Sequence, residues 1–127
     1  MEKVFVDTNI IIDFTKGFGK NLKELIFLQK RNHLQVFVNS IVIAEFFNEK
    51  NLNNKKSFEL ANRLFQFFEV MDIGKNIGLL AGELLRTNQV NFLADALIAA
   101  TCLKHNLLLA TNNKKDFRKT KGLNFYK

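Results

Sequence analysis

Four acidic residues lie where hydrophobic runs of the chain begin or end, and this placement is the strongest indication of chemistry in the sequence. Asp7 directly follows the apolar residues 4–6, and Glu45 follows the run at residues 41–44. Carboxylates beside buried segments are costly to desolvate unless a positive group compensates for their charge. Acids gathered at one place in a basic protein are therefore candidates for binding hard cations. The four residues are Asp7, Glu45, Asp95 and Asp116.

Clustered carboxylates of this kind predict metal-dependent hydrolysis. They repel one another, so that without a cation at least one of them would have to bind a proton. Mg²⁺ and Mn²⁺ relieve the repulsion because both prefer carboxylate and water oxygens. One or two such ions lower the pKa of a bound water and offset the charge on a leaving oxygen, which is what cleavage of a phosphodiester bond requires. No side-chain nucleophile is needed.

Polar residues next to these acids could hydrogen-bond the metal ligands or contact a phosphate. Thr-Asn and Asn-Asn pairs are also common in helix caps and turns, so a structural role stays open for each of them. We expect Asp13, most of two helical turns beyond Asp7, to face away from the site as a structural residue. The polar candidates are Thr8, Asn9, Thr111, Asn112 and Asn113.

The other residue types that often do chemistry are few and isolated. Cys102 is the only cysteine, which excludes an intrachain disulfide and a cysteine-based zinc site. Its small apolar neighbours predict a buried core residue. His33 and His105 fall at the ends of expected helices, where the helix dipole accounts for them. The chain offers no Ser-His or Cys-His pair.

The composition is that of a globular protein with a positive surface. With 127 residues, of which 47% are hydrophobic, the chain can bury a core as one domain spanning residues 1–127. Its 19 Lys and Arg against 12 Asp and Glu give a net charge of +7, which attracts a polyanion such as nucleic acid. A lysine-rich surface that serves only solubility is the alternative. With no membrane-length apolar stretch and no secretory pattern, we expect a cytoplasmic protein.

Hydrophobic periodicity predicts short strands that alternate with helices. Strands separated by helices imply a parallel sheet covered on both faces, which is a three-layer α/β/α sandwich with a central, mainly parallel sheet of four to five strands. Ligands of such sheets bind outside the carboxyl ends of the strands, where the four acids can converge. The expected strands are residues 4–6, 36–38, 70–73 and 107–111, with 123–125 as the fifth. The expected helices are residues 10–15, 22–30, 41–49, 57–68, 76–86 and 92–105.

Phenylalanine is unusually frequent, with 14 residues, and it is concentrated in two of these helices. The helices at 41–49 and 57–68 carry apolar side chains over too wide an arc for a single buried face. Such a surplus often marks a partner interface, although packing in the core is the simpler explanation for any one ring. The rings concerned are Phe46, Phe47, Phe58, Phe65, Phe67 and Phe68.

Four blocks of the sequence, taken in order, resemble the PIN-domain family. They are residues 4–13, 39–46, 94–101 and 109–117, and in size and order they most resemble VapC-type toxins of type II toxin–antitoxin pairs. The resemblance implies a PIN-like fold and an endoribonuclease that depends on Mg²⁺ or Mn²⁺. It also implies an RNA substrate, a cognate antitoxin that wraps the toxin and occludes its site, and a homodimer. The catalytic, metal-binding acids that it implies are Asp7, Glu45, Asp95 and Asp116.

Other function classes fit parts of the pattern. A haloacid-dehalogenase-like phosphatase also has an Asp after its first strand, but it needs a second acid where this chain has Asn9. A receiver-like signalling domain needs paired acids after the first strand, which are missing. A non-catalytic nucleic-acid-binding module would use the acids only as caps and surface charges. A PIN nuclease of RNA processing, outside any toxin–antitoxin pair, would share the same site.

Overall fold

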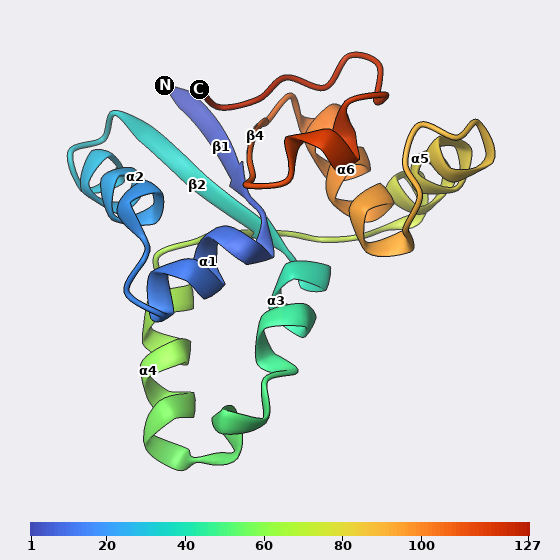
Figure 1. Ribbon diagram of the computed structural model, residues 1–127. Helices are drawn as coiled ribbons and strands as arrows, with labels where there is room; N and C mark the ends of the chain where they lie inside the picture. Colours follow the sequence, from blue (N-terminus) through green and yellow to red (C-terminus); the bar gives the residue numbers. More distant parts are fainter.

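Four short parallel strands form the centre of the protein (Figure 1). The computed structural model describes every residue from 1 to 127. The strands pair in the order β3-β2-β1-β4, and the central strand β1 places Val4 beside Val36 of β2 and Leu108 of β4. The two central strands are apolar at successive positions because both faces of a parallel sheet are covered. The strands are β1 (Glu2–Val6), β2 (Leu34–Asn39), β3 (Glu69–Met71) and β4 (Leu108–Ala110).

Six α-helices and two short 3-10 helices complete the fold. In Figure 1, α1 and α2 lie on one side of the sheet and α5 and α6 on the other. The three-layer α/β/α sandwich that the sequence predicts is thereby confirmed, with a sheet that is parallel throughout. None of the helices combines the length and the apolar character needed to cross a bilayer. The helices are α1 (Thr8–Thr15), α2 (Lys20–Lys30), α3 (Ser40–Phe47), η1 (Lys50–Asn53), α4 (Lys55–Phe65), α5 (Lys75–Arg86), α6 (Leu93–His105) and η2 (Lys114–Phe117).

The strand order reverses next to β1, and this reversal creates the place for a site. From β1 the chain moves outward through β2 to β3, and it then crosses the sheet to place β4 on the other side of β1. Crossovers between parallel strands are right-handed, so the two directions put their helices on opposite faces. Between β1 and β4 the connecting helices diverge, which leaves a crevice at the carboxyl ends of these strands.

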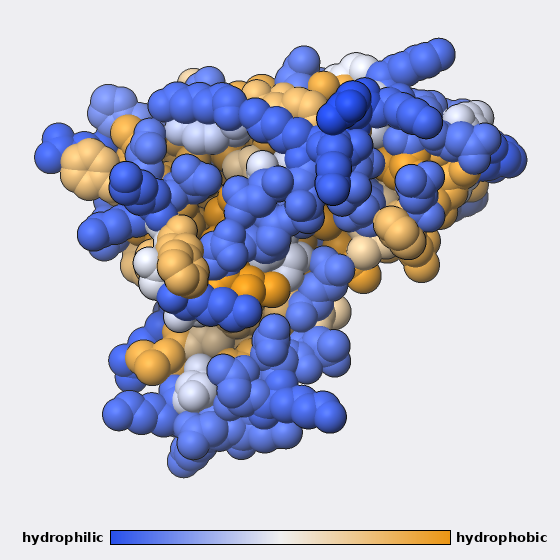
Figure 2. All heavy atoms as spheres, in the orientation of Figure 1, coloured by the Kyte–Doolittle hydropathy of each residue, from blue (hydrophilic) through white to orange (hydrophobic).

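The segment α3–η1–α4 extends from the carboxyl edge of the sheet as an arm (Figure 1). The phenylalanines of the arm also pack on one another and on Phe68, just after it, with ring centroids 5.0 to 5.5 Å apart. Phe46 and Phe68 are buried, whereas Phe58 is 43% exposed and Phe67 is 40% exposed. Apolar atoms come to the surface between the arm and the body (Figure 2), where a cavity of about 510 Å³ is lined by Ile12, Phe14, Thr15 and Lys16 and by residues of the arm. Core packing therefore explains part of the phenylalanine surplus, and the partner interface stays a prediction.

The elements differ from the predicted ones mainly at their ends. The fifth strand is reduced to one bridge, because only Leu109 bonds to the terminal segment: its N–H donates to Asn124 O and its O accepts from Tyr126 N, each at 2.9 Å. Helix α4 ends at Phe65, where Gln66 N turns back to Arg63 O. Helix α1 begins two residues earlier than expected.

The core is one cluster of 28 buried residues that includes the central strands and the inner faces of α1, α2, α5 and α6. Cys102 is buried in this cluster, which confirms its predicted place in the core. Burial raises the pKa of its thiol far above the ordinary range, so this sulfur stays protonated and unreactive. His105 is the last residue of α6, at the helix end that the sequence predicts.

Candidate functional site

Asp7 is a carboxylate held in a fixed orientation between the two strands that flank the crevice. It follows β1 directly and caps α1, and its Oδ1 accepts from Thr8 N at 2.7 Å. Its Oδ2 accepts from the Thr111 hydroxyl at 2.7 Å, and its backbone N–H donates to Ala110 O at 3.0 Å. The side chain is only 6% exposed. Residues at the ends of β1 and β4 thus fix this carboxylate from both sides.

Glu45 approaches the same place from α3. Asn39 caps this helix by accepting from Val42 N at 3.1 Å, and Glu45 follows within the next turn and a half. Its Oε1 accepts from the Thr8 hydroxyl at 2.7 Å. Thr8 therefore contacts two of the acids, Asp7 through its N–H and Glu45 through its hydroxyl.

Asp95 comes from the opposite layer, in the first turn of α6, and is half-buried. It lines the same cavity as Asp7 and Glu45, which has a volume of about 360 Å³. Three of the four predicted acids, carried by three different elements, thus share one cavity. The lining residues are Asp7, Thr8, Asn9, Ile12, Glu45, Asn48, Asp95 and Asn113.

Asp116 lies at the edge of this site, on η2, and is exposed. It does not line the cavity, yet it is near enough for its charge to raise the pKa of both Asp7 and Asp95. The structure therefore brings the fourth acid close to the other three without placing it among them.

The five polar candidates differ in what they contact. Thr8 and Thr111 bind the acids directly, while Asn9 lies 3.4 Å from Asp7 Oδ2 and its Oδ1 accepts from Asn112 N at 3.3 Å. Asn113 lines the cavity, and its N–H donates to the Thr111 hydroxyl at 3.0 Å. Asn112 instead donates from its side chain to Asp13 at 2.7 Å, away from the acids. Asp13 thereby joins α1 to the segment after β4, and its purely structural role stays a prediction.

The acids of this site are short of compensating charge. Burial raises the pKa of Asp7 above its ordinary value, opposed by the hydrogen bonds from Thr111 and Thr8, and the charges of Glu45 and Asp116 raise it further. The pKa of Asp95 is raised to about 6, by burial first and then by the charges of Asp7, Asp116 and Glu45. No positive side chain is among the groups that perturb either carboxyl. The site thus favours either a proton or a cation.

The donor set suits a hard cation, although the side chains do not form a closed cage. All the lining polar groups are carboxylates, amides and a hydroxyl, which are the oxygen ligands of Mg²⁺ and Mn²⁺. No group of three or more acidic, histidine or cysteine side chains is arranged to hold an ion. Mg²⁺ commonly keeps several waters and takes only one or two protein carboxylates, so an open arrangement fits this ion.

Two buried residues that the sequence analysis did not select join the layers that carry the acids. The Asn39 side chain donates to the Thr101 hydroxyl at 2.9 Å, and that hydroxyl donates to Leu97 O at 2.7 Å. Both residues are fully buried. The pair connects the start of α3, which carries Glu45, to α6, which carries Asp95. The available signal was Thr101 itself, a hydroxyl in an otherwise apolar helical run.

We expect Thr101→Val to destabilise the protein by about 1–3 kcal/mol, because it leaves the buried Asn39 amide without its hydroxyl partner. Urea unfolding measures the free energy of unfolding. Thr15→Val is the matched control, since the Thr15 hydroxyl also bonds a carbonyl of its own helix but is exposed. Equal losses in the two variants would contradict a special role for the buried pair.

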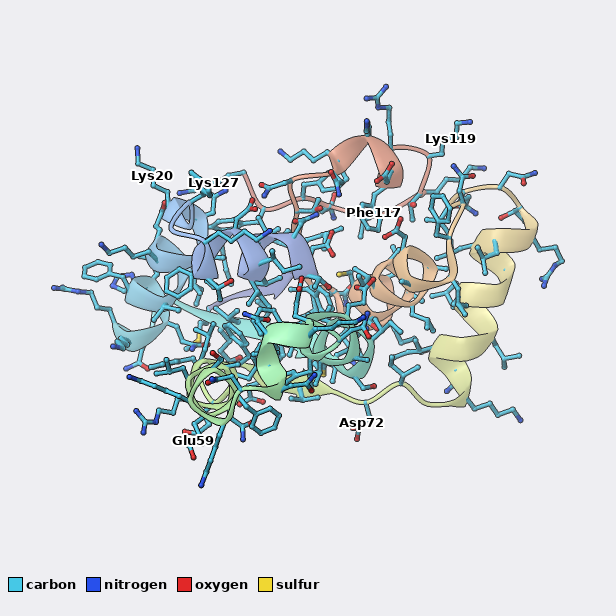
Figure 3. All side chains as sticks on the ribbon, turned by 60° about the horizontal axis from the view of Figure 1, so that its bottom comes forward. Lys20, Glu59, Asp72, Phe117, Lys119 and Lys127 are labelled. Atoms are coloured by element: carbon cyan, nitrogen blue, oxygen red, sulfur yellow. The ribbon has the colours of Figure 1, made fainter.

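We expect Asp95→Asn to stabilise the metal-free protein increasingly as the pH rises from about 4 to 7. The folded state raises the pKa of Asp95 from 3.8 to about 6, so it binds more protons than the unfolded state and loses stability as the pH rises through this window. Thermal unfolding in chelator, compared between variant and wild type at each pH, measures the effect. Asp72→Asn is the control, because Asp72 is exposed and points away from the protein (Figure 3). A difference that shrinks with rising pH would contradict the electrostatic picture.

The sequence matches the PIN domain model over residues 4–123. The fold is similar to that in a DNA-bound VapBC structure from Salmonella typhimurium, with a TM-score of 0.83, 23% identity, and 99% of this chain and 98% of the other covered. For VapBC2 from Rickettsia felis bound to a DNA fragment from its promoter, the TM-score is 0.76, with 23% identity and 98% and 97% covered. For a toxin–antitoxin complex from Klebsiella pneumoniae, the TM-score is 0.72, with 24% identity and 94% of each chain covered. No curated protein matches the sequence significantly.

The family match extends from β1 to the segment beyond η2 and so includes every element that contributes to the acidic cavity. The PIN resemblance carried by the four sequence blocks is confirmed. The chain belongs to the PIN domain family.

Proposed function

We propose that the protein is an endoribonuclease that depends on Mg²⁺ or Mn²⁺ and cleaves RNA at the acidic cavity. The observation that carries the proposal is that Asp7, Glu45 and Asp95 share one cavity without a compensating positive side chain. PIN domains in general depend on divalent metal ions, which supports the assignment. The non-catalytic alternative treats the acids as caps, and Asp7 does cap α1. A helix cap, however, needs only the carboxylate of Asp7, and it does not explain why Glu45 and Asp95 lie in the same cavity.

Asp7, Glu45 and Asp95 would hold the ion, and Asp116 would complete the acidic set from the edge of the cavity. Bound there, Mg²⁺ or Mn²⁺ would lower the pKa of a coordinated water and offset the charge on the leaving oxygen. The raised pKa values of Asp7 and Asp95 fit this role, because a cation removes the repulsion that otherwise favours their protonation.

The polar neighbours of the acids orient them and can contact the substrate. Thr111 and the Thr8 N–H hold the two oxygens of Asp7, and the Thr8 hydroxyl holds Glu45. Such contacts fix the direction of the lone pairs that face an ion. Asn9 and Asn113 line the cavity with side-chain amides, which are suitable donors for the oxygens of a phosphate.

We further propose that the nuclease is the toxin of a toxin–antitoxin pair, that it forms a homodimer, and that a cognate antitoxin occludes its site. The likeness of the fold to VapBC and toxin–antitoxin structures, over nearly the whole length of both chains, supports this role. A PIN nuclease of RNA processing outside such a pair is the alternative. The net charge of +7 suits an RNA substrate in either case.

Replacing Asp7 or Asp95 by Asn is expected to lower the rate of RNA cleavage by more than about 100-fold, because each change removes a ligand of the ion. The measurement is cleavage of a labelled RNA in Mg²⁺ or Mn²⁺, with Asp72→Asn as the matched control on an exposed loop. Excess EDTA should stop cleavage by the wild type. Cleavage that continues unchanged in EDTA would contradict the metal-dependent mechanism.

Expression of the wild type alone is expected to arrest cell growth, since an uninhibited nuclease destroys RNA that the cell needs. Asp7→Asn and Asp95→Asn should remove the arrest, whereas Asp72→Asn should keep it. Growth curves after induction measure the effect. A harmless wild type that still cleaves RNA in vitro would favour the nuclease outside a toxin–antitoxin pair.

A further inference from the structure

We propose that a ridge of four cations beside the acidic cavity binds the phosphate backbone of the RNA and leads it into the site. The ridge consists of Lys115, Arg118, Lys119 and Lys121. The inference deepens the proposed function, on which it depends for the identity of RNA as the ligand. The binding of a nucleic acid to this surface can nevertheless be measured without cleavage.

Charge is concentrated in this short segment to an unusual degree. Residues 114–121 read Lys-Lys-Asp-Phe-Arg-Lys-Thr-Lys, so that five of the 19 cations of the chain fall within eight positions. The segment begins four residues after β4 and includes η2. Like charges so close together repel one another, and a polyanion is the ligand that removes this repulsion.

Two inward side chains fix the segment and thereby turn its cations outward. Phe117 is 1% exposed, and Figure 3 shows it between η2 and α6. The buried Thr120 hydroxyl donates to Gln89 O at 3.2 Å, and the Lys121 N–H donates to the Gln89 side chain at 2.9 Å. Lys119, by contrast, points outward in the same view. The ridge is therefore an anchored surface.

The cations of the ridge have no carboxylate partner within the protein. The one salt bridge of the structure joins Lys127 to Glu24. Lys114 differs from the ridge, because its ammonium group donates to Lys127 O at 3.0 Å and lies 5.7 Å from the centre of the Phe125 ring. All four ridge side chains are exposed, so their charges are available to a ligand. A merely solvated lysine face is the simpler explanation, and the position of the ridge distinguishes the two.

The ridge adjoins the cavity without neutralising it. Asp116, whose charge reaches Asp7 and Asp95, lies within the same segment, and Asn113, directly before the segment, lines the cavity. None of the four cations is among the groups that perturb Asp7 or Asp95. Positive charge therefore lies on the same short segment as Asp116 without offsetting the charge of Asp7 or Asp95, and these acids remain free to hold an ion.

The arm offers a matched control surface. Lys55, Lys56 and Arg63 are exposed on α4, on the arm, and they do not line the acidic cavity. Replacing them by Gln removes the same three charges, from two lysines and one arginine, as replacing Lys115, Lys119 and Arg118. A loss of binding caused only by a lower net charge would be equal in the two triple variants.

The test measures binding of a labelled single-stranded RNA in EDTA, by fluorescence anisotropy between 50 and 200 mM salt. Each lost phosphate contact lowers the slope of log affinity against log salt by about 0.7 for a single strand. We expect the ridge triple variant to lose about 2 in slope and the arm variant to keep the slope of the wild type. Equal slopes in the two variants, or a wild type that binds no RNA, would overturn the proposal. Thermal unfolding checks that both variants remain folded.

A second binding experiment uses a DNA strand of the same sequence. Tighter binding of DNA through the same three cations would overturn RNA as the ligand. Cleavage in Mg²⁺ separates this inference from the proposed function. If the wild type binds RNA through the ridge but never cleaves it, the ridge proposal stands and the nuclease proposal fails. If the wild type cleaves RNA but the two triple variants bind it alike, the nuclease proposal stands and the ridge proposal fails.

Discussion

The buried carboxylate of Asp7 is the constraint on which the rest of the site depends. A carboxylate that is 6% exposed would be strongly destabilising without partners, and the Thr8 N–H and the Thr111 hydroxyl supply them. Those partners stand at the start of α1 and after β4, so the carboxylate is satisfied only where the sheet reverses its strand order. The reversal also brings α6 with Asp95 to the crevice. The buried Asp7 carboxylate can therefore exist only with this sheet topology, and it is also one of the charges of the cavity.

The two layers that carry the other acids are joined by apolar packing and by a single buried polar pair. Asn39 caps α3, which carries Glu45, and bonds Thr101 of α6, which carries Asp95. Buried hydrogen bonds of this kind are directional, whereas apolar contacts tolerate small shifts. The buried Asn39–Thr101 contact therefore restricts how far the start of α3 can shift relative to α6.

Much of the fold could be predicted because its pattern is local. The apolar run of β1 ended by Asp7, and the helical period of α2 and α4, indicated strands that alternate with helices and hence a parallel sheet with covered faces. The ends of the elements could not be predicted in this way, because they depend on tertiary contacts, as when the last strand shrinks to the two hydrogen bonds of Leu109. Asp7, Glu45 and Asp95 were identifiable from their places beside apolar runs. The contact between Asn39 and Thr101 was not, because Thr101 stands out as a hydroxyl in an apolar run but nothing in the sequence indicates a partner 62 positions away.

The bond between Asp7 and Thr111 joins positions separated by 104 residues. During synthesis, Asp7 is made almost at once, whereas Thr111, whose hydroxyl holds it, is made only near the end of the chain. Until β4 has emerged and paired with β1, the centre cannot assemble. The acidic cavity is therefore one of the last parts of the fold that can form as the chain is made.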